Sequence, residues 1–231
     1  MPSSSWTPIQ SSIIRKQLVA ITGLMMVGFL IAHLSGNFLI FAGPEAFNGY
    51  SEKLRHLGAL LWVARIILLA ALVVHVYLAI QLTAENHNAR GGRYTVANHK
   101  GEGGFAKTTM IYTGLLVLAF IALHLYDFTF RAKIGDPTII EGVNGGESLG
   151  LYGLVWNSFL QPWHAGLYIL AMIVLGLHLS HGIQSLFQSL GIAHDRYTPK
   201  IKKIGFALAI ILAVGFISIP IYVNLVRTPH L

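Results

Sequence analysis

The chain has 231 residues, of which 54% are hydrophobic and only 11% are charged, and it carries a formal net charge of +7. Soluble domains typically carry about 25% charged residues, so this composition excludes an ordinary soluble domain and indicates an integral membrane protein. The lack of cysteine excludes disulfides, cysteine-ligated zinc and cysteine-held iron–sulfur clusters within the chain, and basic residues confined to short clusters argue against nucleic-acid binding.

Five apolar stretches are long enough to cross a membrane, which takes about 20 helical residues. They cover residues 18–41, 57–83, 108–130, 163–190 and 204–226. The first stretch follows Arg15 and Lys16 and is too long for a cleaved signal peptide, so we expect a retained anchor. No internal repeat is evident beyond the alternation of spans, and no loop is long enough for a separate core. We therefore expect an all-α membrane protein, a five-helix transmembrane bundle forming one membrane-anchor domain over residues 1–231.

The connection over residues 131–162 begins with turn-forming residues and then carries the apolar piece SLGLYGLVWNSFLQPW, which starts at Ser148. Its aromatic residues favour the boundary between lipid and water. The piece is too short to cross the membrane and return, so we expect a short interfacial helix and not a sixth span.

Lysine and arginine collect on the cytoplasmic side of membrane proteins, so their distribution predicts the orientation. One side of the predicted bundle holds Arg15, Lys16, Arg90, Arg93, Lys100, Lys107, Arg196, Lys200, Lys202 and Lys203. The other side holds Lys53, Arg55, Arg65, Arg131, Lys133 and Arg227, offset by Glu45, Glu52, Asp127, Asp136, Glu141 and Glu147. The N-terminus is therefore expected in the cytoplasm and the C-terminus outside.

Histidine in hydrocarbon is costly unless it is hydrogen-bonded or ligates something, and five of the eleven histidines fall within spans. These five are His33, His75, His124, His178 and His181. At about 1.5 Å per residue from the inner helix ends, His33 and His124 lie roughly 24 and 25 Å up, whereas His75 and His178 both lie roughly 15 Å up. The four therefore form two pairs at two depths, and the members of each pair lie on different helices.

Two imidazoles at equal height on separate helices can ligate one haem iron from opposite faces, so this pattern predicts two haems enclosed by the bundle. Six glycines in the first and fourth spans would leave room for a flat macrocycle or for close helix contact: Gly23, Gly28, Gly36, Gly166, Gly176 and Gly182. Single histidines in membrane helices also serve packing or proton relay, and single glycines usually serve packing. The paired arrangement is what favours haem over these alternatives.

His178 and His181 share roughly one helix face and compete as ligands, although the depth of His178 matches His75 better. His164 begins the fourth span beside Trp163, where we expect an interfacial role, with contact to a quinone headgroup as the alternative. The other histidines fall in loops or at ends, where a solvated side chain is expected: His56, His87, His99, His194 and His230.

The chain resembles the cytochrome b membrane anchor of succinate dehydrogenase and fumarate reductase, in the single-chain, five-helix, two-haem b558 form. The resemblance covers the five spans in order. It is carried by TGLMMVGFLIAH ending at His33, ALHLYDF around His124, GLHLSHGIQSL from Gly176, and KKIGFALAIILAVGF in the last span. The HxxxG pattern from His178 to Gly182 matches the ligand motif of the family, which favours His178 over His181.

The resemblance implies an electron-transfer subunit, with the dicarboxylate chemistry on a flavoprotein subunit and an iron–sulfur subunit at the cytoplasmic face of a bacterial membrane. Electrons from succinate, a tricarboxylic acid cycle substrate, would reach an inner haem b, then an outer haem b, and then a quinone. Two-haem members usually use menaquinone, and some members run in reverse toward fumarate. The family pairing assigns His75 and His178 to the inner haem iron, and His33 and His124 to the outer one.

The chain also departs from the family. Gly176 stands where one fumarate reductase branch has a glutamate that transfers protons, so that pathway is not expected here. Glu52 lies in the loop that holds an acidic quinol-site residue in the same branch, but the correspondence is loose. Arg15 and Lys107 are candidate partners for inner propionates, and Arg65 for an outer propionate or for lipid headgroups.

Two rival functions remain at this stage. The first is a cytochrome b subunit of another redox complex, such as a hydrogenase or a formate dehydrogenase. The second is a histidine-rich metal or proton transporter, against which stands the lack of aspartate or glutamate in the middle of any predicted span.

Overall fold

The structure is a computed structural model and describes residues 11–89, 104–130, 138–192 and 194–229. All regular elements among these residues are helices, and the extended backbone contributes one isolated bridge between Ile139 and Ser148. The all-α class expected from the sequence is therefore confirmed for the described residues.

Five of the helices are long and apolar enough to cross a membrane, as the sequence predicts. They are α1 (Ser12–Asn37), α3 (Ala59–Asn88), α4 (Gly104–Leu125), α6 (Pro162–Ser189) and α7 (Thr198–Val226). A 3₁₀ turn extends α1 to Ala42, and a π-helical turn extends α4 to Phe130. Several helices run past the predicted boundaries because their polar ends continue the helix beyond the apolar stretch.

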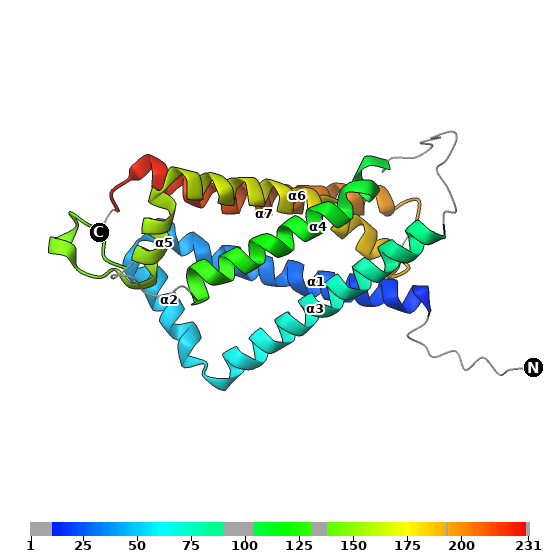
Figure 1. Ribbon diagram of the computed structural model, residues 1–231, viewed down its shortest axis with the longest axis horizontal. Helices are drawn as coiled ribbons and strands as arrows, with labels where there is room; N and C mark the ends of the chain where they lie inside the picture. The colour runs from blue at the N-terminus through cyan, green and yellow to red at the C-terminus, as the bar shows by residue number, and fades with distance from the viewer. Residues whose placement is uncertain (1–10, 90–103, 131–137, 193, 230–231) are drawn as a thin grey trace, which may run out of the picture.

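The five long helices lie roughly side by side, and the two ends of the bundle differ (Figure 1). The starts of α1, α4 and α7 lie at one end with the last turns of α3 and α6; we call this the inner end, following the predicted orientation. There Arg15 donates two hydrogen bonds to Glu85, at 2.5 and 2.7 Å, which ties the start of α1 to the last turns of α3. The opposite, outer end holds α2 (Pro44–His56), α5 (Gly150–Leu160) and the end of α7.

Helix packing joins α6 closely to α7, α1 to α3 and to α6, and α4 to α6, whereas α3 diverges from α1 toward the outer end (Figure 1). Small residues make the closest of these contacts, as is usual for membrane helices. A Cβ on Gly205 would lie 2.7 Å from Ile183, and one on Gly176 would lie 2.9 Å from the Cβ of Ala213. Gly176 therefore allows close contact between α6 and α7. Of the two roles expected for it, room for a macrocycle or helix contact, the structure shows helix contact.

The outer end is closed by α2 and α5. The helix expected within residues 148–163 is present as α5, whereas the sequence analysis did not anticipate α2. The aromatic residues of α5 do not face outward, because Tyr152 and Trp156 are only 1% and 0% exposed. Asn48 of α2 holds the start of α5, donating to the Leu149 carbonyl at 2.8 Å and accepting from the Tyr152 backbone N–H at 3.0 Å. Two short helices that cover each other thus bury the aromatic faces that the sequence alone would assign to the lipid boundary.

Candidate functional site

His75 projects from α3 onto the early part of α1. Its Nδ1 atom lies 3.0 Å from the Val19 carbonyl oxygen and 3.2 Å from Thr22 Oγ1. The Thr22 hydroxyl donates its own hydrogen to the Leu18 carbonyl at 2.7 Å, which leaves Oγ1 as an acceptor. A carbonyl can only accept, so Nδ1 of His75 carries the ring hydrogen and Nε2 keeps its lone pair.

His178 projects from α6 onto α4 in the same way. Its Nδ1 lies 3.2 Å from Thr113 Oγ1. The Thr113 hydroxyl donates to the Met110 carbonyl at 3.0 Å, so its oxygen is again free to accept. His75 and His178 are close enough to interact electrostatically. Both imidazoles therefore present an unprotonated Nε2, the form of histidine that binds metal.

A glycine follows each of these threonines and lies against the imidazole. A Cβ on Gly23 would lie 3.3 Å from Cε1 of His75, and a Cβ on Gly114 would lie 3.2 Å from Cε1 of His178. Both distances are tighter than an ordinary contact, so the imidazole would have to shift. Gly23 was expected to make room for a macrocycle or a helix contact, and what it accommodates here is the edge of an imidazole.

These matching contacts reveal an internal repeat, so the expectation of no repeat was wrong. Thr22 precedes His33 in α1 by the same number of residues as Thr113 precedes His124 in α4. The two segments read TGLMMVGFLIAH and TGLLVLAFIALH. The helices that contact these two segments, α3 and α6, also have a histidine followed six residues later by a glutamine. These residues are His75 and Gln81 in α3, and His178 and Gln184 in α6. The chain thus contains two related units, α1 with α3 and α4 with α6.

His33 and His124, which are equivalent in the repeat, face each other nearer the outer end. Their ring centroids are 5.8 Å apart and their planes are nearly perpendicular, at 87°. Aromatic side chains surround the two imidazoles: Phe29 and Phe216 contact His33, whereas Phe120, Phe128 and Tyr168 contact His124. Nδ1 of His124 is buried and has no hydrogen-bond partner within the described part of the chain.

Of the two pairs predicted from depth, His33 and His124 lie in ring contact, whereas His75 and His178 each contact a threonine of the neighbouring helix. His75 of the lower pair meets α1 at Thr22, about 10 Å along that helix from Arg15, and not at the roughly 15 Å counted along α3. The difference arises because α3 leans away from α1, so that residues counted along it do not measure height (Figure 1). Along α1, Thr22 and His33 are about 16 Å apart, which sets the separation of the two levels.

The four side chains fit haem as a donor set. Each level offers two imidazoles from different helices within an apolar bundle, the usual way in which a bundle core holds a cofactor. At the lower level the hydrogen-bonded Nδ1 atoms match the way metal-ligating histidines are held from behind. At the upper level Nδ1 of His124 is buried and has no hydrogen-bond partner among the described residues. Hydrogen bonding within that part of the chain therefore does not explain why this imidazole is buried.

The other histidines are placed as follows. His178, and not His181, makes the contact with Thr113, and His181 is partly exposed one turn further along α6. His56 is exposed and lies 3.6 Å from Glu52. His87 and His194 are also exposed, and His99 and His230 lie outside the described residues.

His164 is the main exception, because it was expected at the interface and is only 6% exposed. Its Nδ1 lies 2.9 Å from the Ser158 carbonyl and its Nε2 lies 2.8 Å from Oδ2 of Asp127. Tyr168 donates to the same oxygen at 2.8 Å. Both ring nitrogens of His164 thus lie within hydrogen-bond distance of an oxygen. Such a satisfied pair is the form in which these groups tolerate burial.

The sequence analysis missed this buried cluster of Asp127, His164 and Tyr168. Asp127 lies in the π-helical turn directly after α4, and such turns are frequent at functional sites. The available signal was a lone carboxylate one turn after His124, in a stretch otherwise too apolar to solvate it.

The remaining candidate residues have local partners or open surroundings. Arg15 is paired with Glu85, and Arg65 lies over the ring of Trp62, 5.1 Å from its centroid. Glu52 is exposed and lies beside His56. The side chain of Lys107 lies outside the described part of the chain, as do Arg90, Arg93, Lys100, Arg131, Lys133 and Asp136.

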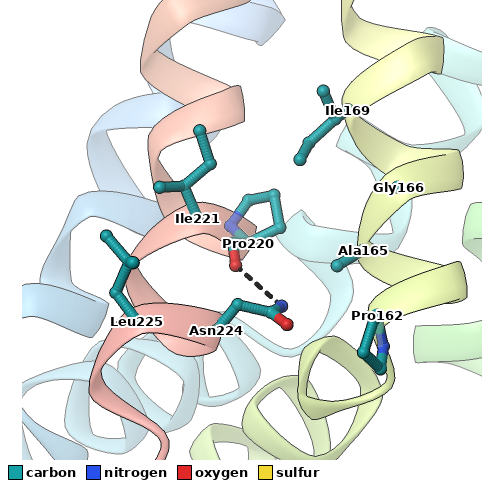
Figure 2. Close-up of a pocket in the computed structure, with 8 residues that line it drawn as sticks. All are labelled: Pro162, Ala165, Gly166, Ile169, Pro220, Ile221, Asn224 and Leu225. Carbon is teal, nitrogen blue, oxygen red and sulfur yellow. Dashed lines mark hydrogen bonds between the residues drawn. The ribbon is translucent and has the colours of Figure 1, made fainter.

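The glycines divide into two groups. Gly28 and Gly166 have open space around the position of a Cβ, whereas Gly36 lies against the ring of Tyr50 and Gly182 lies near Met110. An apolar groove of about 240 Å³ runs past Gly166 between α6 and α7 near the outer end (Figure 2). It is lined by Pro162, Ala165, Gly166, Ile169, Pro220, Ile221, Asn224 and Leu225 and contains no histidine.

Comparison of the chain with models of protein families, with curated proteins and with solved structures found no match.

Proposed function

We propose that the chain is the dihaem cytochrome b membrane anchor of a succinate:quinone oxidoreductase, a succinate dehydrogenase or fumarate reductase. It would carry electrons between an iron–sulfur subunit and a membrane quinone, with menaquinone as the expected substrate. The observation that best supports this proposal is the pairing of histidines across the repeat. His75 with His178, and His33 with His124, each combine equivalent residues from the two units at one level of the bundle.

The chain itself would hold, orient and shield the two haem b groups. Haem supplies a reversible one-electron carrier. His75 and His178 would ligate the inner haem iron through Nε2, and His33 and His124 would ligate the outer one. The apolar side chains of five helices exclude water from both levels, and the spacing of about 16 Å divides the membrane crossing into shorter steps.

The partners follow from the family resemblance and the predicted orientation. The flavoprotein and iron–sulfur subunits would bind the inner end, in the cytoplasm of a bacterium, next to His75 and His178. The dicarboxylate reaction would take place on those subunits, and this chain would contribute the quinone-reactive end of the enzyme.

The spectrum of the purified complex tests the proposal. We expect low-spin b-type bands from two haems per chain, and succinate-dependent reduction of a menaquinone analogue. A protein with two haems that instead couples to hydrogen or formate would point to another redox complex. A colourless protein with intact partner subunits would overturn the proposal and leave a histidine-rich transporter as the better explanation.

A further inference from the structure

We propose that Thr22–Gly23 on α1 and Thr113–Gly114 on α4 are two equivalent positioning seats, which fix His75 and His178 as Nε2 ligands of the inner haem. This inference rests on the proposed function. It adds four residues that the ligand motifs do not include and assigns them a role in setting ring tautomer and ring position.

The hydrogen bonds of the seats determine the tautomer. Each threonine hydroxyl donates its hydrogen to a carbonyl of its own helix: Thr22 to Leu18 at 2.7 Å, and Thr113 to Met110 at 3.0 Å. The hydroxyl oxygens can therefore accept from the imidazoles. The Val19 carbonyl accepts from Nδ1 of His75 as well, at 3.0 Å. An imidazole facing only acceptors on one edge must carry its hydrogen there, so the lone pair lies on the opposite edge. The seats therefore decide which nitrogen is free to bind iron.

The glycines determine how closely each imidazole approaches the neighbouring helix. An added Cβ would come within 3.3 Å of Cε1 in His75 and 3.2 Å in His178, so neither ring could keep its position beside a larger residue. Gly28 lies on the same helix as Gly23, and a Cβ there would meet nothing within 4 Å. Close approach to the imidazole is thus a property of the seat and not of every glycine in the helix.

The seats serve only the inner pair. His124 has a buried Nδ1 without a hydrogen-bond partner in the described residues, and its ring is held by Phe120, Phe128 and Tyr168. Hydrogen bonding to Nδ1–H raises the basicity of a metal-bound histidine. Loss of the seat hydroxyls should therefore affect the inner haem and leave the outer haem unchanged.

The first experiment replaces the hydroxyls in the whole complex. Thr22→Val with Thr113→Val should lower retention of the inner haem about 10-fold and raise its midpoint potential, because the ligands become weaker donors. His178→Ala identifies the inner haem in the spectrum. Thr22→Ser with Thr113→Ser keeps the hydroxyls and should restore both properties. Thr83→Val is the control, because the Thr83 hydroxyl also donates within its helix, to Ala79 at 2.7 Å, and touches no imidazole.

The second experiment tests the steric half of the seats. Gly23→Ala and Gly114→Ala should each alter the electron paramagnetic resonance signal of the inner haem, because the imidazole must move. Gly49→Ala on α2 should not, because a Cβ there would meet nothing within 4 Å. Wild-type spectra and potentials in the valine and the alanine variants, with two haems retained, would overturn the seats and leave the proposed function intact. A wild-type protein without haem would instead overturn the proposed function.

Discussion

At the scale of single residues, the four paired histidines differ in what holds them. His75 is held by hydrogen bonds to a threonine and a carbonyl, and His178 by a hydrogen bond to a threonine, whereas His124 is held by aromatic rings. A hydrogen bond fixes the direction in which a ring nitrogen points, whereas aromatic packing fixes only the plane of the ring. The two levels are therefore chemically distinct sites, and removing a ligand from one level should leave the other intact.

The ligand assignment can be tested one level at a time. His124→Ala should remove one of the two haem signals and spare the other, and His178→Ala should remove the complementary signal. His181→Ala is the matched control on α6, and it should keep both signals because the contact with Thr113 belongs to His178. Optical difference spectra with haem quantification measure all three. Loss of a haem in His181→Ala, with both retained in His178→Ala, would reverse the assignment.

The buried cluster around Asp127 predicts a stability effect. Asp127→Ala removes the acceptor for both His164 and Tyr168 and leaves their polar groups buried without it. Breaking a buried pair in this way costs about 3–5 kcal/mol. Thermal unfolding in detergent should show a clear loss of stability. Glu52→Ala removes an exposed partner of His56 and should leave the unfolding temperature nearly unchanged. Equal unfolding temperatures for the two variants would contradict the structural importance of the cluster.

At the scale of elements, apolar runs predicted the five spans because hydrocarbon demands about 20 such residues per crossing. The helix α2 escaped prediction because PEAFNGYSEKLRH is short and polar, and it is stabilised by tertiary contacts with α5 through Asn48. The burial of Tyr152 and Trp156 also depends on that contact. The repeat went unseen because, beyond the shared Thr-Gly-Leu at their start, its two copies keep only a few separated residues in common.

Helix packing explains why position 176 is a glycine and not the glutamate of one fumarate reductase branch. A Cβ at this position would lie 2.9 Å from the Cβ of Ala213 on α7, so a glutamate could not fit without separating α6 from α7. Gly176→Ala should therefore lower the unfolding temperature in detergent. Gly166→Ala lies on the same helix, where a Cβ would meet nothing within 4 Å, and should change it little. A Gly176→Ala variant as stable as Gly166→Ala would show that the close contact between α6 and α7 is not required.

At the scale of the whole molecule, α1 and α4 both begin at the inner end, so the two repeated units run in the same direction (Figure 1). Parallel repeats of this kind are related by an axis along the membrane normal. Each unit then supplies one histidine to each level, and both levels lie near the same axis. The helix α7 lies outside the repeat and packs against α6 and α1. The arrangement places the two histidine pairs at two levels along the helix bundle.

Under the proposed function, the membrane orientation determines which histidine pair lies nearer the cytoplasm, and the chain offers a simple way to measure it. The native sequence has no cysteine, so any single introduced cysteine reports alone. Lys53 on α2 and Lys200 on α7 are both exposed and lie at opposite ends of the bundle. The lysine and arginine distribution predicts that Lys53→Cys reacts with a membrane-impermeant maleimide in intact cells. Lys200→Cys should react only after the membrane is opened. The reverse pattern would place His33 and His124, and not His75 and His178, nearest the cytoplasm.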